Sequence, residues 1–344
     1  MKKTIALLIA MGVIASVISG CDSQVTNNTN STSNESSASN ESSASNESGE
    51  SYSIGICQLV QHESLDAATQ GFQDALVEKL GEANVSFDLQ NASGDTANCA
   101  TIVNQFVSAD TDLILANATA SLQAAAAATN EIPILGTSIT DYATALEMEE
   151  WTGTTGRNIS GTSDLAPLDG QAEIIKELFP EISKIGLLYC SAEANSLYQI
   201  NQIEQYLTAA GYECERYTFA DSNDLASVAT NAAATSKLIY VPTDNTVASN
   251  AEIINNVFGP LQIPVVTAEA DTCKVAGVAT LAIDYYDIGY QTGLMAYEVL
   301  VNDSDIKTLP VETVKEANKL YVPERCEELG ITVSDEYTAI EVEN

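Results

Sequence analysis

Three polar residues, Thr243, Asp244 and Asn245, directly follow an apolar segment whose residues 238–241 read Leu-Ile-Tyr-Val. This segment is typical of a strand buried on both faces, and Pro242 ends it. A helical pattern follows, so the three polar residues are potential N-caps. Such an arrangement places hydroxyls, a carboxylate and free N–H groups at the carboxyl edge of a sheet, where open α/β sheets bind small ligands. An ordinary helix cap explains a single stretch of this kind equally well.

Comparable polar clusters follow seven other predicted strands. The candidate ligand-binding residues that we take from all eight are Gln61, His62, Thr119, Ser121, Thr137, Ser138, Asp141, Ser163, Asn195, Ser196, Asp244, Asn245, Glu269 and Asp284. Parallel strands all end at one edge of their sheet, so we expect these side chains to converge on a cleft shared by two lobes. Their repetition, rather than any single cluster, favours a binding site over capping alone.

These residue types suit a zwitterionic amino acid. Helix N-termini with Ser or Thr attract a carboxylate, and we expect Thr119 and Ser121 to bind it. A carboxylate of the protein suits an ammonium, and we expect Asp244 or Asp284 to hold it. The side chain of the ligand then needs an apolar or aromatic surface. Aromatic residues that are candidates for this surface, or for the core, are Trp151, Tyr142, Tyr198, Tyr285 and Tyr286.

The sequence gives little support to catalysis or to cofactor binding. His62 is the single histidine, and no nucleophile motif or metal-ligand spacing accompanies it. No Gly-x-Gly-x-x-Gly follows the first predicted strand, and no phosphate-binding loop is present, so nucleotide binding is not expected. We therefore predict no enzyme activity, no cofactor and no metal. Because Asp and Glu are so frequent, a glycosidase pair of carboxylates stays open as an alternative.

The first 20 residues have the pattern of a secretory signal, with Lys2 and Lys3 before an apolar core. Ile18-Ser19-Gly20-Cys21 resembles a bacterial lipobox, in which the signal is removed and the cysteine is diacylated. Two acyl chains anchor a protein stably at a membrane without a spanning helix. Residues 22–51 are rich in Ser, Asn and Glu, with the unit Asn-Glu-Ser-Ser-Ala-Ser repeated at residues 34–39 and 40–45, and we expect a disordered tether. Cys21 and this tether form our predicted segment 21–51.

The chain is strongly acidic. It has 13 Lys and Arg against 48 Asp and Glu, and removal of the two lysines of the signal shifts the formal charge from −35 to −37. Such a charge argues against nucleic acid as a partner. Besides Cys21 there are six cysteines, without zinc-type spacing, and we expect free thiols rather than a disulfide framework.

From residue 52 the pattern alternates between strands and helices, which predicts parallel sheets with right-handed crossovers. Predicted strands cover 53–59, 85–90, 112–116, 132–136, 184–189, 212–219, 238–241, 263–267 and 278–283, and predicted helices 64–80, 96–108, 121–129, 169–178, 196–210, 225–234, 247–257 and 288–301. The rhythm restarts near residue 160, which indicates two lobes of similar topology. The order of the C-terminal tail is not assigned.

Several motifs occur together and in order along residues 52–333. They include Ile54-Gly55-Ile56, Gln90-Asn91-Ala92-Ser93-Gly94-Asp95, Gly161-Thr162-Ser163-Asp164, Glu193-Ala194-Asn195-Ser196, Pro242-Thr243-Asp244-Asn245-Thr246 and Asp284-Tyr285-Tyr286. In this the chain resembles the family of ABC transporter substrate-binding lipoproteins that includes tryptophan- and tyrosine-binding members. The resemblance implies an α/β fold of the type I periplasmic binding protein class. In that fold, two Rossmann-like lobes with parallel sheets are joined by a three-crossing hinge.

The resemblance also implies lobe boundaries and partners. The N-terminal lobe would comprise residues 52–162 and 285–312, and the C-terminal lobe residues 163–284 and 313–344. A membrane permease and its ATPase would be the partners. Matched residues expected in the cleft are Ser163, Asn195, Ser196, Asp244, Asn245 and Asp284. Two loops depart from the family pattern: Gln61-His62-Glu63-Ser64 stands where Glu-His-Pro-Ala is usual, and Thr140-Asp141-Tyr142 where Thr-Asp-Pro is usual.

The sequence thus predicts a monomeric receptor, anchored by a lipid at the outer face of a bacterial cell membrane, that captures an amino acid for an ABC importer. The resemblance favours an aromatic one: tyrosine, tryptophan or phenylalanine. An adhesin that uses the same fold as a scaffold is the alternative, and a hydrolase on this architecture is a third hypothesis. Sequence alone does not identify the amino acid or the permease.

Overall fold

The computed structural model describes residues 51–313 and 316–341. The predicted signal, the predicted lipidation site Cys21 and the predicted tether up to residue 50 lie outside the described residues. Within the described part, every helix is too short or too polar to cross a membrane.

The first lobe is built on a six-stranded parallel sheet with the order β11-β5-β4-β3-β1-β2. Its strands are β1 (Tyr52–Gln58), β2 (Val85–Asn91), β3 (Leu113–Asn117), β4 (Ile134–Ile139), β5 (Ile159–Ser163) and β11 (Glu312–Thr313). Its helices are α1 (Glu63–Leu80), α2 (Thr96–Ser108), α3 (Thr119–Ala128), α4 (Tyr142–Ala145) and α11 (Tyr285–Leu300), with a 3-10 turn, η1 (Glu82–Asn84). Apolar clusters cover both faces of this sheet.

The second lobe is built on a seven-stranded sheet with the order β13-β12-β10-β9-β8-β6-β7. Its strands are β6 (Lys184–Cys190), β7 (Glu213–Phe219), β8 (Leu238–Val241), β9 (Val265–Thr267), β10 (Ala279–Ala282), β12 (Asn318–Tyr321) and β13 (Thr338–Ala339). Its helices are α5 (Leu168–Leu178), α6 (Ala194–Ala209), α7 (Ser222–Thr235), α8 (Asn245–Ala248), α9 (Ala251–Phe258), α10 (Ala270–Ala276) and α12 (Pro323–Leu329), with a second 3-10 turn, η2 (Gly259–Leu261).

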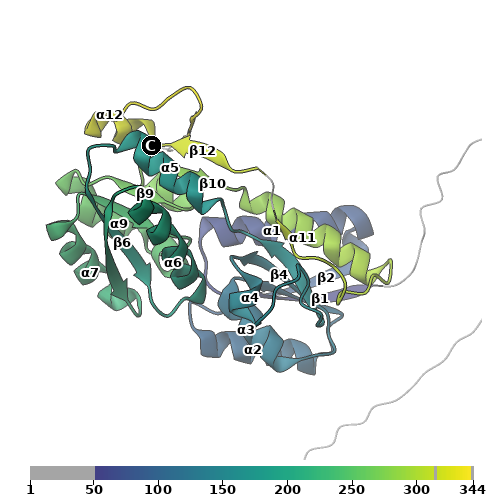
Figure 1. The fold of residues 1–344 in the computed structure, drawn as a ribbon. Helices are drawn as coiled ribbons and strands as arrows, with labels where there is room; N and C mark the ends of the chain where they lie inside the picture. The colour runs from purple at the N-terminus through teal and green to yellow at the C-terminus, as the bar shows by residue number, and fades with distance from the viewer. Residues whose placement is uncertain (1–50, 314–315, 342–344) are drawn as a thin grey trace, which may run out of the picture. The chain divides into compact units, whose positions relative to one another are not determined.

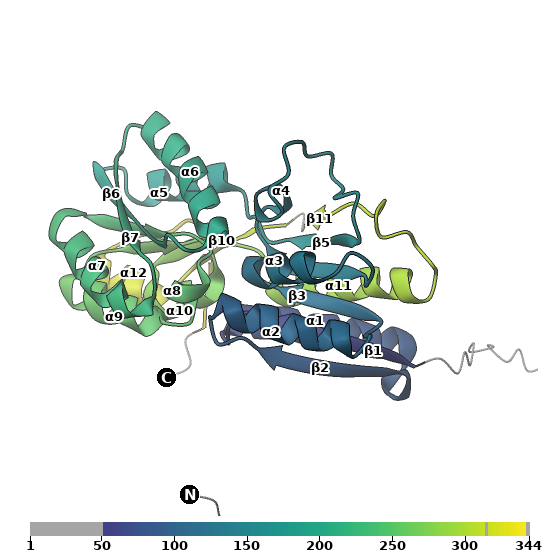
Figure 2. The same ribbon diagram turned by 90° about the horizontal axis from the view of Figure 1, so that it is seen from below.

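The chain passes between the two sheets three times, after β5, after β10 and after β11 (Figures 1 and 2). The predicted fold class is therefore confirmed: two α/β lobes with mainly parallel sheets and a three-crossing hinge. One strand pair departs from the parallel pattern, because β12 runs antiparallel to β10. This strand belongs to the tail whose order the sequence did not indicate.

Close packing of α1 and α11 fixes the hinge side of the first lobe. A Cβ atom on Gly289 would lie 1.9 Å from the backbone oxygen of Ala68, and one on Gly71 would lie 2.2 Å from that of Tyr286. Only glycine therefore allows the two backbones to approach this closely. Since α11 begins just after the second crossing, the hinge is anchored on α1 (Figure 1).

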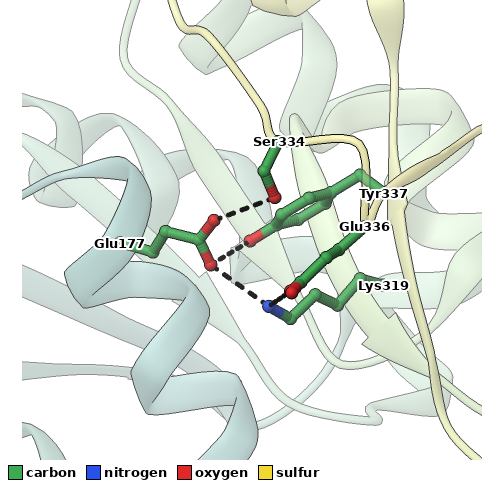
Figure 3. Close-up of polar contacts among 5 residues, drawn as sticks. All are labelled: Glu177, Lys319, Ser334, Glu336 and Tyr337. Carbon is green, nitrogen blue, oxygen red and sulfur yellow. Dashed lines mark hydrogen bonds and ion pairs between the residues drawn. The ribbon is translucent and has the colours of Figure 1, made fainter.

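The C-terminal tail is held on α5 by a polar cluster (Figure 3). The Glu177 carboxylate accepts hydrogen bonds from Lys319 Nζ at 3.2 Å and from the Tyr337 hydroxyl at 3.0 Å. The Lys319 ammonium also donates to Glu336 at 2.8 Å and lies 5.2 Å from the Tyr337 ring centroid. The Ser334 hydroxyl donates to Glu177 at 3.4 Å. These contacts attach the last part of the described chain to the second lobe.

Several helices differ from the predicted elements. The predicted helix 247–257 is divided into α8 and α9 at Ser249 and Asn250. Helices α4 and α10 follow strands closely and were not predicted. The six cysteines of the described part are free thiols, as expected.

Candidate functional site

A cavity of about 540 Å³ is lined by residues of both lobes. The first lobe contributes the loop after β1 and the starts of α2 and α3, and the second lobe contributes the starts of α6, α7 and α8. Four of the predicted site residues line it: Gln61, Thr119, Asn195 and Asn245. Apolar parts of the wall include Leu59, Val60, Ala120, Ala192 and Ala220.

The starts of five helices line this cavity, at Thr96, Thr119, Ala194, Ser222 and Asn245. The first N–H groups of a helix have no partner within the helix, and the helix dipole makes this end attractive to anions. Two of these helices, α3 and α6, have N-cap residues whose side chains make no capping hydrogen bond. Their first N–H groups therefore favour a carboxylate in the cavity.

The backbone is strained at the first-lobe wall. Ala118, the N-cap of α3, has a φ of 85°, and Ser138 in β4 has a φ of 57°. Both are non-glycine residues in the left-handed region, which is costly and is concentrated at functional sites. The Ser138 hydroxyl is buried, and none of the described residues hydrogen bonds to it. Sequence alone selected Ser138 as polar, but its strain and its unsatisfied oxygen are visible only in the structure.

Glu193 organises the second-lobe wall. Its carboxylate accepts from the backbone N–H of Asn245 at 3.0 Å and from that of Thr246 at 2.8 Å. It also accepts from the side chains of Asn195 at 3.1 Å, of Asn245 at 2.8 Å and of Thr246 at 2.7 Å. The loops after β6 and β8 are thereby held together. Glu193 was not among the candidate residues; a carboxylate directly before a predicted helix, in the Glu-Ala-Asn-Ser motif, was the available signal.

Asp244 and Asp284 do not have the position expected of an ammonium contact. Asp244 is 1% exposed, and its two oxygens accept from the N–H groups of Cys190 at 2.7 Å and Val247 at 2.9 Å. Burial and the nearby Glu193 raise its pKa to about 8. Asp284 is exposed and caps α11 by accepting from Tyr286 N at 2.9 Å. Both carboxylates accept hydrogen bonds from backbone N–H groups, and neither residue lines the cavity.

His62 lies where the two lobes meet. Its Nε2 is 3.3 Å from the side-chain oxygen of Asn245, whose amide nitrogen donates to Glu193. The amide oxygen can only accept, so Nε2 carries the hydrogen. Burial lowers the pKa of His62, which favours the neutral ring, and its Nδ1 is then an acceptor. None of the described residues pairs with this buried Nδ1.

A second cavity, of about 240 Å³, lies beside His62 and is acidic. His62, Glu269 and Asp271 line it, and Gln61, Ser249 and Asn250 are shared with the first cavity. Burial raises the pKa of Glu269 to about 8, and nearby carboxylates act in the same direction. No Lys or Arg of the described residues forms an ion pair with Glu269. A cationic group at this side of the junction would favour the ionised form of Glu269.

A third buried carboxylate, Asp164, belongs to the hinge. It accepts from the Thr140 hydroxyl at 2.9 Å and from the Tyr285 hydroxyl at 2.9 Å. The Gln199 amide donates to Thr140 at 3.4 Å, which links the second lobe to the loop after β4. Burial raises the pKa of Asp164. Both oxygens of this carboxylate are occupied, so it stabilises the hinge rather than facing a cavity.

The other predicted residues make structural contacts and line neither cavity: Thr137 lies 3.4 Å from the Thr162 hydroxyl, Ser121 contacts two buried thiols, Asp141 caps α4, Ser163 donates to Thr140 O at 2.9 Å, and Ser196 donates to Thr243 O at 3.5 Å. The expected aromatic surface is not found, since none of the described residues lining either cavity is aromatic. Tyr142 and Tyr285 are core residues, and Trp151 is 42% exposed and stacks on Tyr142.

Two α/β lobes with a ligand-sized cavity between them define the chain as a receptor of the periplasmic binding protein type. The sequence model of the family described as "ABC transporter substrate binding protein" matches residues 53–343. The chain belongs to this family. A relative from Clostridioides difficile (strain R20291), named "Tyrosine-binding protein", is 35% identical over 317 residues, which cover 92% of this chain and 88% of that protein.

Similar solved structures support the same family assignment. The ABC domain from Streptococcus pneumonia in complex with L-Trp is 32% identical, with a TM-score of 0.80, over 83% of this chain and 97% of that one. The ligand-free, open structure of a substrate binding protein with adhesive properties from Clostridium difficile is also 32% identical, with a TM-score of 0.65, over 85% of this chain and 100% of that one. At equal identity the present structure is more similar to the L-Trp complex, in agreement with its hydrogen bonds between the lobes.

Proposed function

We propose that this protein is the substrate-binding component of an ABC importer and that it captures an α-amino acid where its lobes meet. One observation carries the proposal. One cavity is lined by helix N-termini, and the other is acidic and is lined by His62 with its unsatisfied acceptor. The two meet at a junction where they share Gln61, Ser249 and Asn250. An α-amino acid carries its ammonium and its carboxylate on the same carbon, so it matches a junction where one cavity favours an anion and the other a cation.

The residues that would hold each charge differ in part from those expected from sequence. The carboxylate would accept from the N–H groups at the starts of α3 and α6, near Thr119 and Asn195. The ammonium would donate to His62 Nδ1 and to Glu269. Its charge would compensate that of a buried carboxylate that forms no ion pair with any described residue. Asp244, with its oxygens occupied, would support the wall from behind.

We infer an aromatic side chain for the ligand, as expected from the resemblance. The relative from Clostridioides difficile is named for tyrosine binding, and the structure from Streptococcus pneumonia holds L-Trp. The cavity is roomy enough for such a ligand, and Leu59, Val60 and Ala120 offer it an apolar wall. Aliphatic groups would then replace the aromatic surface that was expected.

The cellular setting is part of the proposal. The lipobox-like motif at Cys21 would anchor the chain at the outer face of the cell membrane, and residues 22–51 would tether it. The receptor would be a monomer that delivers its ligand to a permease and its ATPase. The lobes would comprise residues 52–162 with 285–312 and residues 163–284 with 313–344.

Thermal-shift screening of the full chain with the twenty amino acids tests the function. We expect a stabilisation of several degrees with tyrosine, tryptophan or phenylalanine, because a ligand that binds only the folded state raises its stability. Tyramine lacks the carboxylate and 3-(4-hydroxyphenyl)propionate lacks the ammonium, and each should bind at least tenfold more weakly than tyrosine. If no amino acid shifts the melting temperature, the receptor function is refuted and the adhesin hypothesis is favoured.

A further inference from the structure

We propose that Cys57 and Cys99 are a redox-active pair that is oxidised to a disulfide beneath the cavity wall. Both residues are 0% exposed. Their sulfur atoms lie 3.6 Å and 3.7 Å from the same hydroxyl, that of Ser121. The two thiols also interact electrostatically with each other. Three nucleophilic or polarisable groups from β1, α2 and α3 thus meet at one buried point.

The geometry needs little change for the bond to form. Cys57 lies near the end of β1 and Cys99 in the first turns of α2, and both belong to one core cluster. A disulfide requires Cβ atoms about 3.5–4.5 Å apart. Because both sulfurs contact the same Ser121 hydroxyl within 3.7 Å, side-chain rotation with a small shift at the start of α2 is the change needed to join them. The start of a helix is also where such a shift costs least.

The two thiols differ in reactivity in the way a redox pair requires. The interaction with Cys57 lowers the pKa of Cys99 to about 7, whereas the same contact and burial raise the pKa of Cys57. Cys99 is therefore the thiolate that reacts first. With a hydroperoxide as oxidant, its sulfur attacks the terminal oxygen, the O–O bond breaks and a sulfenic acid forms. The Cys57 thiol then displaces that hydroxyl as water, so two thiols and one peroxide give one disulfide and two waters when the oxidant is H₂O₂.

The other four cysteines of the described part lack this arrangement. Cys190 and Cys326 donate to backbone oxygens at 3.5 Å, those of Ala220 and Val278. Cys273 is completely buried, and this burial, with a smaller effect of Cys326, raises its pKa to about 12. Oxidation should therefore select Cys57 and Cys99.

The pair lies directly behind the cavity. Leu59 is two residues after Cys57, Thr96 is three residues before Cys99, and Thr119 is two residues before Ser121; all three line the cavity. A disulfide would fix the start of α2 against β1 and release the Ser121 hydroxyl. The first-lobe wall would become more rigid, and ligand affinity would change with oxidation state.

Peptide mapping tests the pair independently of any ligand. The full chain, purified under reducing conditions, is treated with hydrogen peroxide, denatured, alkylated with iodoacetamide and digested. We expect a linked peptide pair containing Cys57 and Cys99, with two hydrogens lost and the link reversed by dithiothreitol, while the other four thiols are alkylated. The melting temperature should rise by about 5 °C or more, because the link closes a long loop. Alkylation of Cys57 and Cys99 to the same extent as the other four would overturn the proposal.

Two variants sharpen the result. In Cys57→Ala, Cys99 has no resolving thiol, so we expect irreversible sulfinic acid at Cys99 in place of the link. Cys273→Ala is the matched control, since it also removes a buried thiol but should leave the link unchanged. A link from Cys99 to any other cysteine would contradict the inference. If Cys57→Ala does not fold, the map of the unaltered chain decides the question alone.

Discussion

The two walls of the cavity differ in how completely their polar groups are satisfied. In the second lobe, Glu193 accepts five hydrogen bonds and Asp244 accepts two from backbone N–H groups. In the first lobe, His62 Nδ1 and the Ser138 hydroxyl are buried without a partner among the described residues. Glu193 and Asp244 thus hold the second wall together without a ligand, whereas the first lobe retains the acceptor of His62, a residue of the acidic cavity, which a ligand could satisfy.

This difference indicates that the two walls have different roles in ligand binding. A preorganised wall reduces the entropy lost on binding, because its loops are already ordered. Unsatisfied groups on the opposite wall make closure depend on what enters, since a buried acceptor without a donor is costly. Substitutions in the second lobe should therefore affect stability first, and substitutions in the first lobe should affect ligand binding first.

The largest effect is expected from Asp244→Ala. It leaves the N–H groups of Cys190 and Val247 buried without acceptors, which should reduce the free energy of unfolding by about 3 kcal/mol. Ligand affinity should fall at least tenfold as a consequence of the disturbed wall. Urea denaturation and calorimetry measure the two quantities. Asp244→Asn keeps an acceptor and should lose less than half as much stability; equal losses would show that the carboxylate does not support the backbone.

The next largest effect is expected from His62, where ligand affinity should change more than stability. His62→Ala should lower the affinity for the amino acid tenfold to a hundredfold, because the ligand loses an acceptor and the lobes lose a contact. The free energy of unfolding should change by less than about 1 kcal/mol. Ser64→Ala is the matched control, since it removes another contact between the lobes, the hydrogen bond from Ser64 to Asp271 at 2.7 Å. A similar loss of affinity in both variants would assign His62 to closure alone.

Much of this architecture could be predicted because its signals are local. Alternating apolar segments indicated the two parallel sheets, and polar residues after strands led to His62, Thr119, Asn195 and Asn245, all of which line one of the cavities. The antiparallel strand β12 was missed because its partner β10 lies far away in the sequence.

The role of each carboxylate could not be predicted for a related reason. Asp244 and Glu269 both follow a strand and precede a helix, so the sequence treats them alike. The distinction depends on the N–H of Cys190, which reaches Asp244 from 54 residues away, whereas the hydrogen bond to Glu269 comes from the nearby hydroxyl of Thr272. Whether a carboxylate oxygen accepts a hydrogen bond from a distant residue can be seen only in the folded structure.

A smaller and reversible effect is expected from pH. Burial raises the pKa of Glu269 to about 8, so this group is largely protonated at pH 7 in the free protein. A bound ammonium stabilises the ionised form, and binding should release up to one proton. Affinity should then increase with pH by at most about tenfold per unit below pH 8 and level off above it. Calorimetry in phosphate and in Tris measures the proton release, and Glu269→Gln should abolish it.

The smallest effect is expected from Trp151, a first-lobe residue that lines neither cavity. Trp151 belongs to the first lobe and is the single tryptophan, but it is 42% exposed and stacks on Tyr142 at 6.3 Å between ring centroids, away from the lining of both cavities. Trp151→Ala should therefore change the affinity for an aromatic amino acid less than twofold. Leu59→Ala is the contrasting variant, because Leu59 lines the cavity; it should weaken aromatic ligands more than small ones. A tenfold loss in Trp151→Ala with an unchanged Leu59→Ala would show that the aromatic ring, rather than the aliphatic wall, receives the side chain of the ligand.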